Sequence, residues 1–222
     1  MSAVRWLIKC GAAAAIVLIA CGFATVRFGS GLQMPATTTR DGTLITLSRY
    51  LREPVPDIVL VGSSITFRLK EEYFATRGLR NLALAGGSPV TGLEIVANQP
   101  QLPKLILVEA NVLGRPTDAA LVERYSRGDT EPFFFRPVRA AVAAYEQRLH
   151  APLTYEQVAP DLRRLVAQPP SDFDSRIYAD RALQQFNAED PVNAARLNVK
   201  RIQELIRIVE QRGTRVLLFE LP

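Results

Sequence analysis

The sequence predicts an α/β protein with a parallel sheet in a three-layer α/β/α sandwich, preceded by an N-terminal transmembrane or signal-anchor helix. Three observations predict it. An uncharged apolar run, "CGAAAAIVLIACGFATV", fills residues 10–26. Short apolar runs such as "IVLVG", "PKLILVEAN" and "TRVLLFELP" recur further along the chain. Amphipathic segments alternate with these runs, which is typical of parallel strands joined by helical crossovers.

The 222 residues are enough for one sizeable core after the N-terminal segment is set aside. The predicted organisation has three parts. Residues 1–28 form the membrane anchor or signal segment, and residues 29–54 form a linker and a lead-in helix. Residues 55–222 form the α/β domain, with a helical insertion at 112–188.

The first segment predicts contact with a membrane through residues 6–27. Arg5 and Lys9 precede the apolar run, and positive residues in that place favour a cytoplasmic N-terminus. A spanning helix needs about 20 residues, so an uncleaved anchor is our preferred interpretation. The protein is then a single-pass protein of the cell membrane whose domain faces the periplasm. Two alternatives stay open: a lipoprotein lipidated on Cys21 of "LIAC", and an ordinary cleaved signal or buried helix.

Composition argues against several classes of function. The net charge is +5, but the arginines are dispersed among acidic and apolar residues, so we expect no nucleic-acid partner. Both cysteines, Cys10 and Cys21, lie in the apolar segment, and His150 is the single histidine. We therefore expect neither a metal nor another cofactor.

The order of elements follows from periodicity and from helix-end signals. After a linker at 28–42, the sequence predicts helices at 43–53, 65–78, 88–100 and 191–213, and strands at 58–62, 79–86, 103–111 and 214–222. Ser88 is the expected N-cap of the third of these helices, with Pro89 in its first turn. The last helix is expected to bury the stripe Leu197, Ile202, Leu205, Ile206 and Val209, and to end at Gly213.

Small and polar residues follow three of the predicted strands: "GSS" after the first, "NLALAGGS" after the second and "VEAN" after the third. In open parallel sheets, ligands gather beyond the carboxyl ends of the strands. These positions are therefore the candidates for chemistry. Ordinary structural roles are equally open: Ser63 and Ser64 capping a helix, Gly86 and Gly87 forming a turn, and Asn111 closing a strand.

Together the three blocks resemble the SGNH (GDSL-type) hydrolase family, whose fold is flavodoxin-like. The resemblance covers residues 55–113, with a weaker match from 190 onward. It implies that Ser64 is a nucleophile, and that Gly86 and the Asn111 side chain supply oxyanion-hole donors. Asn81 corresponds to the family asparagine that precedes the glycine. The implied activity is that of a serine esterase or O-acyl transferase acting on acylated extracytoplasmic carbohydrate or lipid.

The sequence departs from the family pattern at three positions. Ser63 stands where the family has aspartate, and Glu109 and Val112 replace the glycine and aspartate that flank the family asparagine. We expect Glu109 to pair with an arginine or to lie at the exposed rim, and a catalytic role is the lesser alternative. The run "EPFFFRP", at 131–137, is expected to pack in a core or a lid.

A serine nucleophile needs a base to take its proton. In the family this base belongs to an Asp-x-x-His pair after the last strand, and these 222 residues do not contain it. His150 lies in the insertion and is a poor candidate for the base. Two interpretations follow: a C-terminally incomplete hydrolase, nearly inactive as this fragment, or a non-catalytic envelope protein that binds a glycan or an assembly partner.

Overall fold

The computed structural model describes residues 3–28, 39–126, 153–169 and 191–221, together with the isolated positions 145, 149, 174, 176, 180, 183 and 184. The chain divides into two compact units. The first comprises Met1–Thr37 and Thr130–Pro152, and the second comprises Thr38–Asp129 and Leu153–Pro222.

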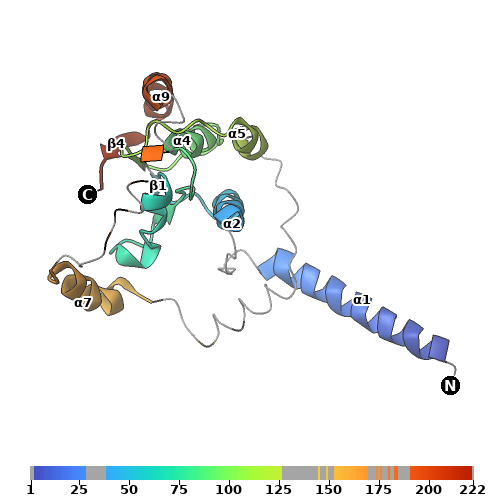
Figure 1. Cartoon of the computed structure of the whole chain (residues 1–222). Helices are drawn as coiled ribbons and strands as arrows, with labels where there is room; N and C mark the ends of the chain where they lie inside the picture. The colour runs from blue at the N-terminus through green and yellow to red at the C-terminus, as the bar shows by residue number, and fades with distance from the viewer. Residues whose placement is uncertain are drawn as a thin grey trace. The chain divides into compact units, whose positions relative to one another are not determined.

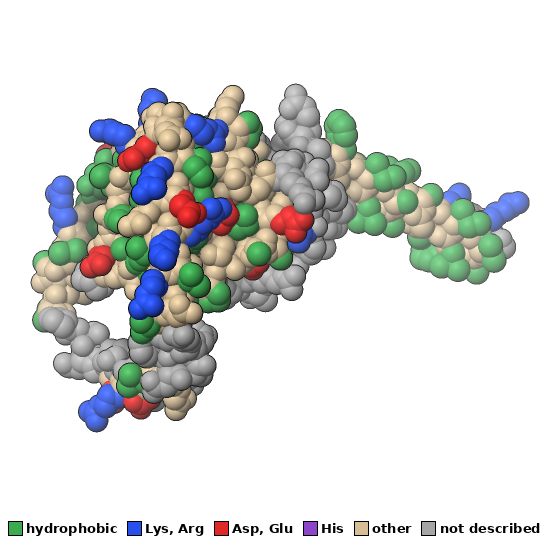
Figure 2. All heavy atoms as spheres, turned by 90° about the horizontal axis from the view of Figure 1, so that it is seen from above, with side chains coloured by type: hydrophobic (Ala, Val, Ile, Leu, Met, Phe, Trp, Pro, Cys, Tyr) green, Lys and Arg blue, Asp and Glu red, His purple; other side chains and the backbone are tan. Residues whose placement is uncertain are grey.

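The first unit contains helix α1, Ala3–Phe28. Its segment Ala3–Phe23 is long and apolar enough to cross a membrane, judged by length and composition. Apolar side chains lie exposed along this helix, and Figure 2 shows them as a green surface with basic groups towards one end. The expected N-terminal apolar helix is confirmed.

The second unit is built on a four-stranded parallel sheet, which confirms the predicted sheet type. Its strands are β1 (Ile58–Val61), β2 (Leu79–Asn81), β3 (Leu105–Glu109) and β4 (Arg215–Phe219). Their spatial order is β2-β1-β3-β4, so β1 and β3 are central. In register, Val61 of β1 lies beside Val108 of β3. Glu109 therefore emerges next to the residue that follows β1.

The helices that the structure describes in this unit with their bounds are α2 (Thr39–Arg52), α3 (Ser64–Phe67), α4 (Pro89–Ala97), α5 (Ala119–Ser126), α7 (Tyr155–Val166) and α9 (Pro191–Gln211), with a 3₁₀ turn, η2, at Glu71–Tyr73. Helix α2 begins inside the segment expected to be linker.

Ser88 caps α4 as expected, because its hydroxyl accepts from the Val90 N–H at 3.3 Å. Helices α5 and α7 lie in the predicted insertion, and residues 127–152 are mostly outside the described residues.

The main core lies between one face of the sheet and helices α2, α4 and α9 (Figure 1). Its buried side chains come from Leu47, Val59, Val61, Leu93, Ile95, Ile106, Val108, Ile202, Leu205 and Val209, among others. The opposite face is covered unevenly. Leu60 of β1 is buried there, whereas Leu217 of β4 remains 57% exposed. The described residues thus establish an α/β fold with a parallel sheet, and one thoroughly covered face.

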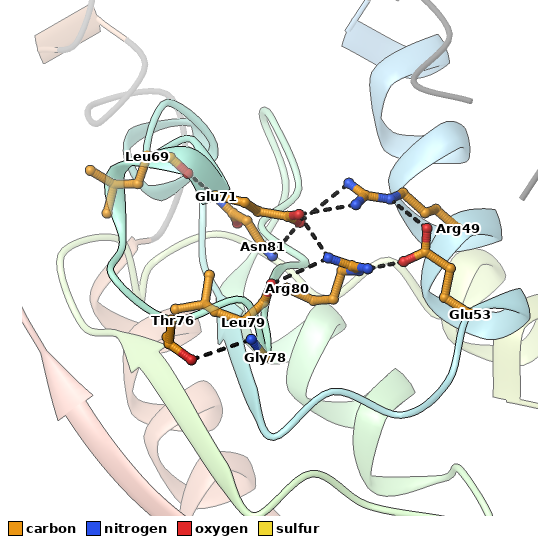
Figure 3. Close-up of polar contacts among 9 residues, drawn as sticks. All are labelled: Arg49, Glu53, Leu69, Glu71, Thr76, Gly78, Leu79, Arg80 and Asn81. Atoms are coloured by element: carbon orange, nitrogen blue, oxygen red, sulfur yellow. Dashed lines mark hydrogen bonds and ion pairs between the residues drawn. The ribbon is translucent and has the colours of Figure 1, made fainter. Parts of the chain in front are cut away.

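The helix expected over residues 65–78 was a wrong prediction, because α3 ends at Phe67. The Asn81 side-chain amide donates to the carbonyls of Thr66 and Leu69, both at 2.7 Å (the Leu69 bond is drawn in Figure 3). A continuing α-helix would use the Thr66 carbonyl for its own ladder. The chain therefore turns through η2 and returns to the sheet as β2.

The buried stripe of α9 also differs from the expected one at a single position. Leu197 is 59% exposed, and its neighbour Asn198 is buried instead. The Asn198 amide donates to the carbonyls of Leu113 and Arg115, both at 2.6 Å, which satisfies a buried polar group. The helix ends before Gly213, whose φ of +88° is the left-handed conformation expected after a helix.

A partly buried ion-pair cluster joins α2 to the β2 edge of the sheet (Figure 3). Arg49 contacts Glu53 at 2.9 Å and Glu71 at 3.0 Å, and Arg80 of β2 contacts the same two carboxylates. Burial alone would lower the pKa of Arg49, but attraction to Glu71 and hydrogen bonding to Glu53 hold that pKa above its ordinary value. The cluster therefore fixes the lead-in helix against the sheet.

Tyr50 of α2 supplies a test of this packing. Its side chain is 6% exposed, its hydroxyl contacts no hydrogen-bonding group among the described residues, and burial raises its pKa to about 12. We expect Tyr50→Phe to leave the protein as stable or more stable by up to about 1 kcal/mol near pH 7, because an unsatisfied buried hydroxyl is removed.

We also expect the stability of the wild type relative to Tyr50→Phe to depend on pH. The folded pKa of Tyr50 lies above the ordinary value of 10.0, so the stabilisation from the neutral phenol is complete below pH 10 and declines as pH rises toward 12. Between pH 9 and 11 the wild type should lose about 1.4 kcal/mol relative to Tyr50→Phe. Urea unfolding of both proteins in one detergent checks this expectation. Parallel stability curves over that pH range would contradict it.

Candidate functional site

The turn Gly62-Ser63-Ser64 leads from β1 into α3. Ser63 is fully buried and is the N-cap of α3, because its hydroxyl accepts from the Ile65 N–H at 3.3 Å. The capping interpretation is therefore confirmed for Ser63. Ser64 is the first residue of α3 and is partly exposed, at the carboxyl end of a central strand.

Glu109 lies beneath this turn and is fully buried. Its carboxylate accepts three hydrogen bonds: from the Ser63 N–H at 2.7 Å, from the Ser63 hydroxyl at 2.7 Å and from the Thr66 hydroxyl at 2.6 Å. Our prediction of an arginine partner or a rim position for Glu109 was wrong. Strand register decides the outcome, because the pairing of Val61 with Val108 brings Glu109 beside Gly62.

The donors around Glu109 match what a buried carboxylate requires. An ionised carboxylate is only an acceptor, and burial is costly unless donors replace the lost water. One backbone N–H and two hydroxyls serve that purpose here. Hydrogen bonds to charged groups are stronger than neutral ones, so the turn is held firmly by this group.

Gly62 is required by the same contact. A Cβ at this position would lie 2.5 Å from the Glu109 Oε2 and 2.6 Å from the Thr66 Oγ1. Both atoms belong to the buried hydrogen-bonded group, so neither can move away without breaking it. The glycine therefore provides the space that the carboxylate occupies.

Asn81 of β2 holds α3 from the other side. Besides donating to the carbonyls of Thr66 and Leu69, its side-chain oxygen accepts from the Ala83 N–H at 2.9 Å. Ser64 thus lies on a short helix that is bonded to both neighbouring strands, through Glu109 from β3 and Asn81 from β2.

Gly86 follows β2 and has a φ of +81°, a conformation that disfavours other residues. It lines an open pocket of about 470 Å³, which is bounded by Thr43, Leu44, Leu84, Ala85, Gly86, Gly87, Thr91, Asp118, Ala120, Leu121 and Arg124. The wall is mixed, with apolar side chains from α2 and α5 and polar groups from Asp118 and Arg124. Neither Ser64 nor Asn111 is among the lining residues.

Asn111 follows β3, and its side chain is paired with the backbone after β4. Its amide donates to the Leu221 carbonyl at 2.7 Å, and its oxygen accepts from the Leu221 N–H at 2.8 Å. This is the strand-closing role that the sequence left open. One amide N–H of the side chain remains for any further acceptor.

Ser64, Gly86 and Asn111 therefore follow three strands that are adjacent in the sheet, and lie beyond the same carboxyl edge. His150 and the "EPFFFRP" run lie outside the described residues. Within the described parts of the chain, no group of three His, Cys, Asp or Glu side chains is placed to hold a metal ion. The contact that sequence reasoning missed is the one between Glu109 and the serine turn. Its signal was an acid at the end of an apolar strand and a glycine before two serines.

We expect Gly62→Ala to lower the free energy of unfolding by about 3 kcal/mol, because the added methyl group overpacks the buried carboxylate. Gly213→Ala is the matched control. It meets nothing within 4 Å and should cost only about 1 kcal/mol, from its left-handed backbone. Denaturant unfolding of both variants measures the difference. Equal losses would mean that Glu109 does not require the glycine.

The chain matches no model of a known protein family. Searches of characterised proteins and of solved structures likewise find no significant similarity to it. The residues themselves must therefore support any functional proposal.

Proposed function

We propose that this protein is a membrane-anchored serine esterase or O-acyl transferase in which Ser64 is the nucleophile. The observation that carries the proposal is the unequal state of two adjacent serines. The Ser63 hydroxyl is buried and makes two hydrogen bonds, one as donor and one as acceptor, whereas the Ser64 side chain is partly exposed and has no hydrogen-bond partner among the described residues. A reactive serine needs this kind of access.

The proposed chemistry is acyl transfer. The Ser64 hydroxyl attacks the carbonyl carbon of an ester while a general base takes its proton, and the base returns that proton to the departing alcohol. The acyl group then passes from Ser64 to water in an esterase, or to a second alcohol in a transferase. Backbone N–H groups of Ser64 and Gly86, with the remaining Asn111 amide N–H, are the proposed donors to the oxyanion. The substrate is an O-acyl group on an extracytoplasmic carbohydrate or lipid, as the resemblance to SGNH hydrolases implies.

The parallel sheet and the placement of these residues beyond its carboxyl edge support an SGNH-like three-layer sandwich as the complete architecture. The apolar helix α1 supports attachment to the cell membrane, and Arg5 and Lys9 near its start favour a periplasmic domain. Lipidation of Cys21 is the alternative form of attachment.

A topology experiment tests the location. Alkaline phosphatase joined after Pro222 should be active and should remain in membranes washed with carbonate, because α1 exports the domain and keeps it attached. Replacing α1 with a cleavable signal peptide should release the activity as soluble protein. Loss of membrane attachment on Cys21→Ser would instead support the lipoprotein. A fusion with only cytoplasmic activity would contradict export.

A second candidate function is supported by Asn111. Its side-chain oxygen and one of its amide N–H groups are already bonded to Leu221, so the side chain has a structural role that requires no oxyanion. The protein would then be a non-catalytic envelope component, and the pocket beside Gly86 would bind a glycan or an assembly partner.

Ser64→Ala separates the two functions. We expect the protein expressed from its own gene to hydrolyse para-nitrophenyl acetate and to form a fluorophosphonate adduct on Ser64. The variant should lose the adduct and reduce hydrolysis by a factor on the order of 10³ or more, because it lacks the nucleophile. Ser126→Ala is the matched control at a partly exposed serine. Equal hydrolysis by wild type and Ser64→Ala would refute the serine mechanism. No adduct and no hydrolysis in either would favour the binding protein.

A further inference from the structure

We infer that Glu109 is a positioning residue for Ser64: its buried carboxylate fixes the turn that presents the Ser64 hydroxyl. The inference rests on the proposed function, because it assigns Glu109 a role in the reactivity of that serine. Glu109 does not touch Ser64 through any hydrogen bond in the described residues, and it acts through Ser63 and Thr66.

The three hydrogen bonds to Glu109 come from residues on both sides of Ser64 in the sequence. Ser63 precedes it and donates twice, with the N–H to Oε2 and the hydroxyl to Oε1 of Glu109. Thr66 follows it by two residues and donates to Oε2. The residues on both sides of Ser64 are therefore bound to one carboxylate, which restricts the backbone between them.

The same bonds decide which serine is available. The Ser63 hydroxyl donates a hydrogen bond to Glu109 and accepts one from the Ile65 N–H, so its O–H group is engaged and one of its lone pairs is used. Ser63 is also fully buried. Glu109 thus holds Ser63 in the extended conformation of an N-cap, with φ −96° and ψ −161°, and leaves Ser64 as the accessible hydroxyl.

A carboxylate suits this task better than its amide. Both carboxylate oxygens accept, so all three donors are satisfied at once. In Glu109→Gln one oxygen becomes an NH₂ group: in the place of Oε2 it would oppose the Ser63 N–H, and in the place of Oε1 it forces the Ser63 hydroxyl to turn from donor to acceptor. The variant keeps the side-chain volume and the space above Gly62, so it changes the hydrogen bonding with little change in packing.

The first experiment measures fluorophosphonate labelling of Ser64 in the protein expressed from its own gene. We expect Glu109→Gln to reduce the saturating labelling rate at least tenfold, with the half-saturating concentration unchanged, because the turn is misoriented while the site stays open. Thr214→Val is the matched control: it removes a buried hydroxyl that donates to the Pro103 carbonyl at 2.7 Å, at the amino end of β4. It should lower stability and leave labelling unchanged.

If Glu109→Gln is labelled at the same rate as the wild type, this inference is overturned and the proposed function stays intact. An equal loss of rate in Thr214→Val and Glu109→Gln would also overturn it, since general destabilisation would then explain both.

The second experiment does not depend on catalysis. A nitroxide is attached to the Ser64→Cys variant in a background of Cys10→Ser and Cys21→Ser, and its mobility is measured by electron paramagnetic resonance. Adding Glu109→Gln should sharpen the spectrum, whereas adding Thr214→Val should not. An unchanged spectrum with Glu109→Gln would overturn the inference. If the wild type is never labelled by fluorophosphonate, the proposed function fails, and the spectrum still decides whether Glu109 fixes the turn.

Discussion

The buried carboxylate of Glu109 is the interaction on which the rest of the site depends. Because it lies in the interior, it must collect donors, and the chain supplies them from the first turn after β1. That requirement explains a glycine at 62, a serine that caps α3 and a threonine one turn along the short helix. A single buried carboxyl group thus accounts for the residue types of the turn and bonds the turn to the carboxyl end of β3.

Much of the fold was accessible from the sequence, because the central strands and long helices carry strong apolar periodicity. The runs around Val59 and Ile106 predicted buried parallel strands, and Ser88 with Pro89 predicted the start of α4. The short α3 was not accessible in this way. Its end depends on Asn81, which lies further along the chain and donates hydrogen bonds to the carbonyls of Thr66 and Leu69.

The environment of Glu109 also could not be predicted, because strand register, not local sequence, brings it beside Gly62. The structure nevertheless links two positions that looked independent. Ser63 and Glu109 are both departures from the motif that the sequence resembles, and they are hydrogen-bonded to each other. For Ser64, Gly86 and Asn111, the sequence predicted the shared sheet edge. It could not predict that Asn111 is already paired with Leu221.

The two outer strands of the sheet, β2 and β4, differ in how their free edges are protected. At the β2 edge, the strand is short and Arg80 is held in ion pairs, both of which discourage pairing with another chain. Strand β4 is longer, and its central residues Val216, Leu217 and Leu218 are all apolar, without the charge, proline or bulge that protects edge strands. Among the described residues β4 pairs only with β3. Its outward-facing backbone N–H and C=O groups are therefore of the kind with which a further strand can pair.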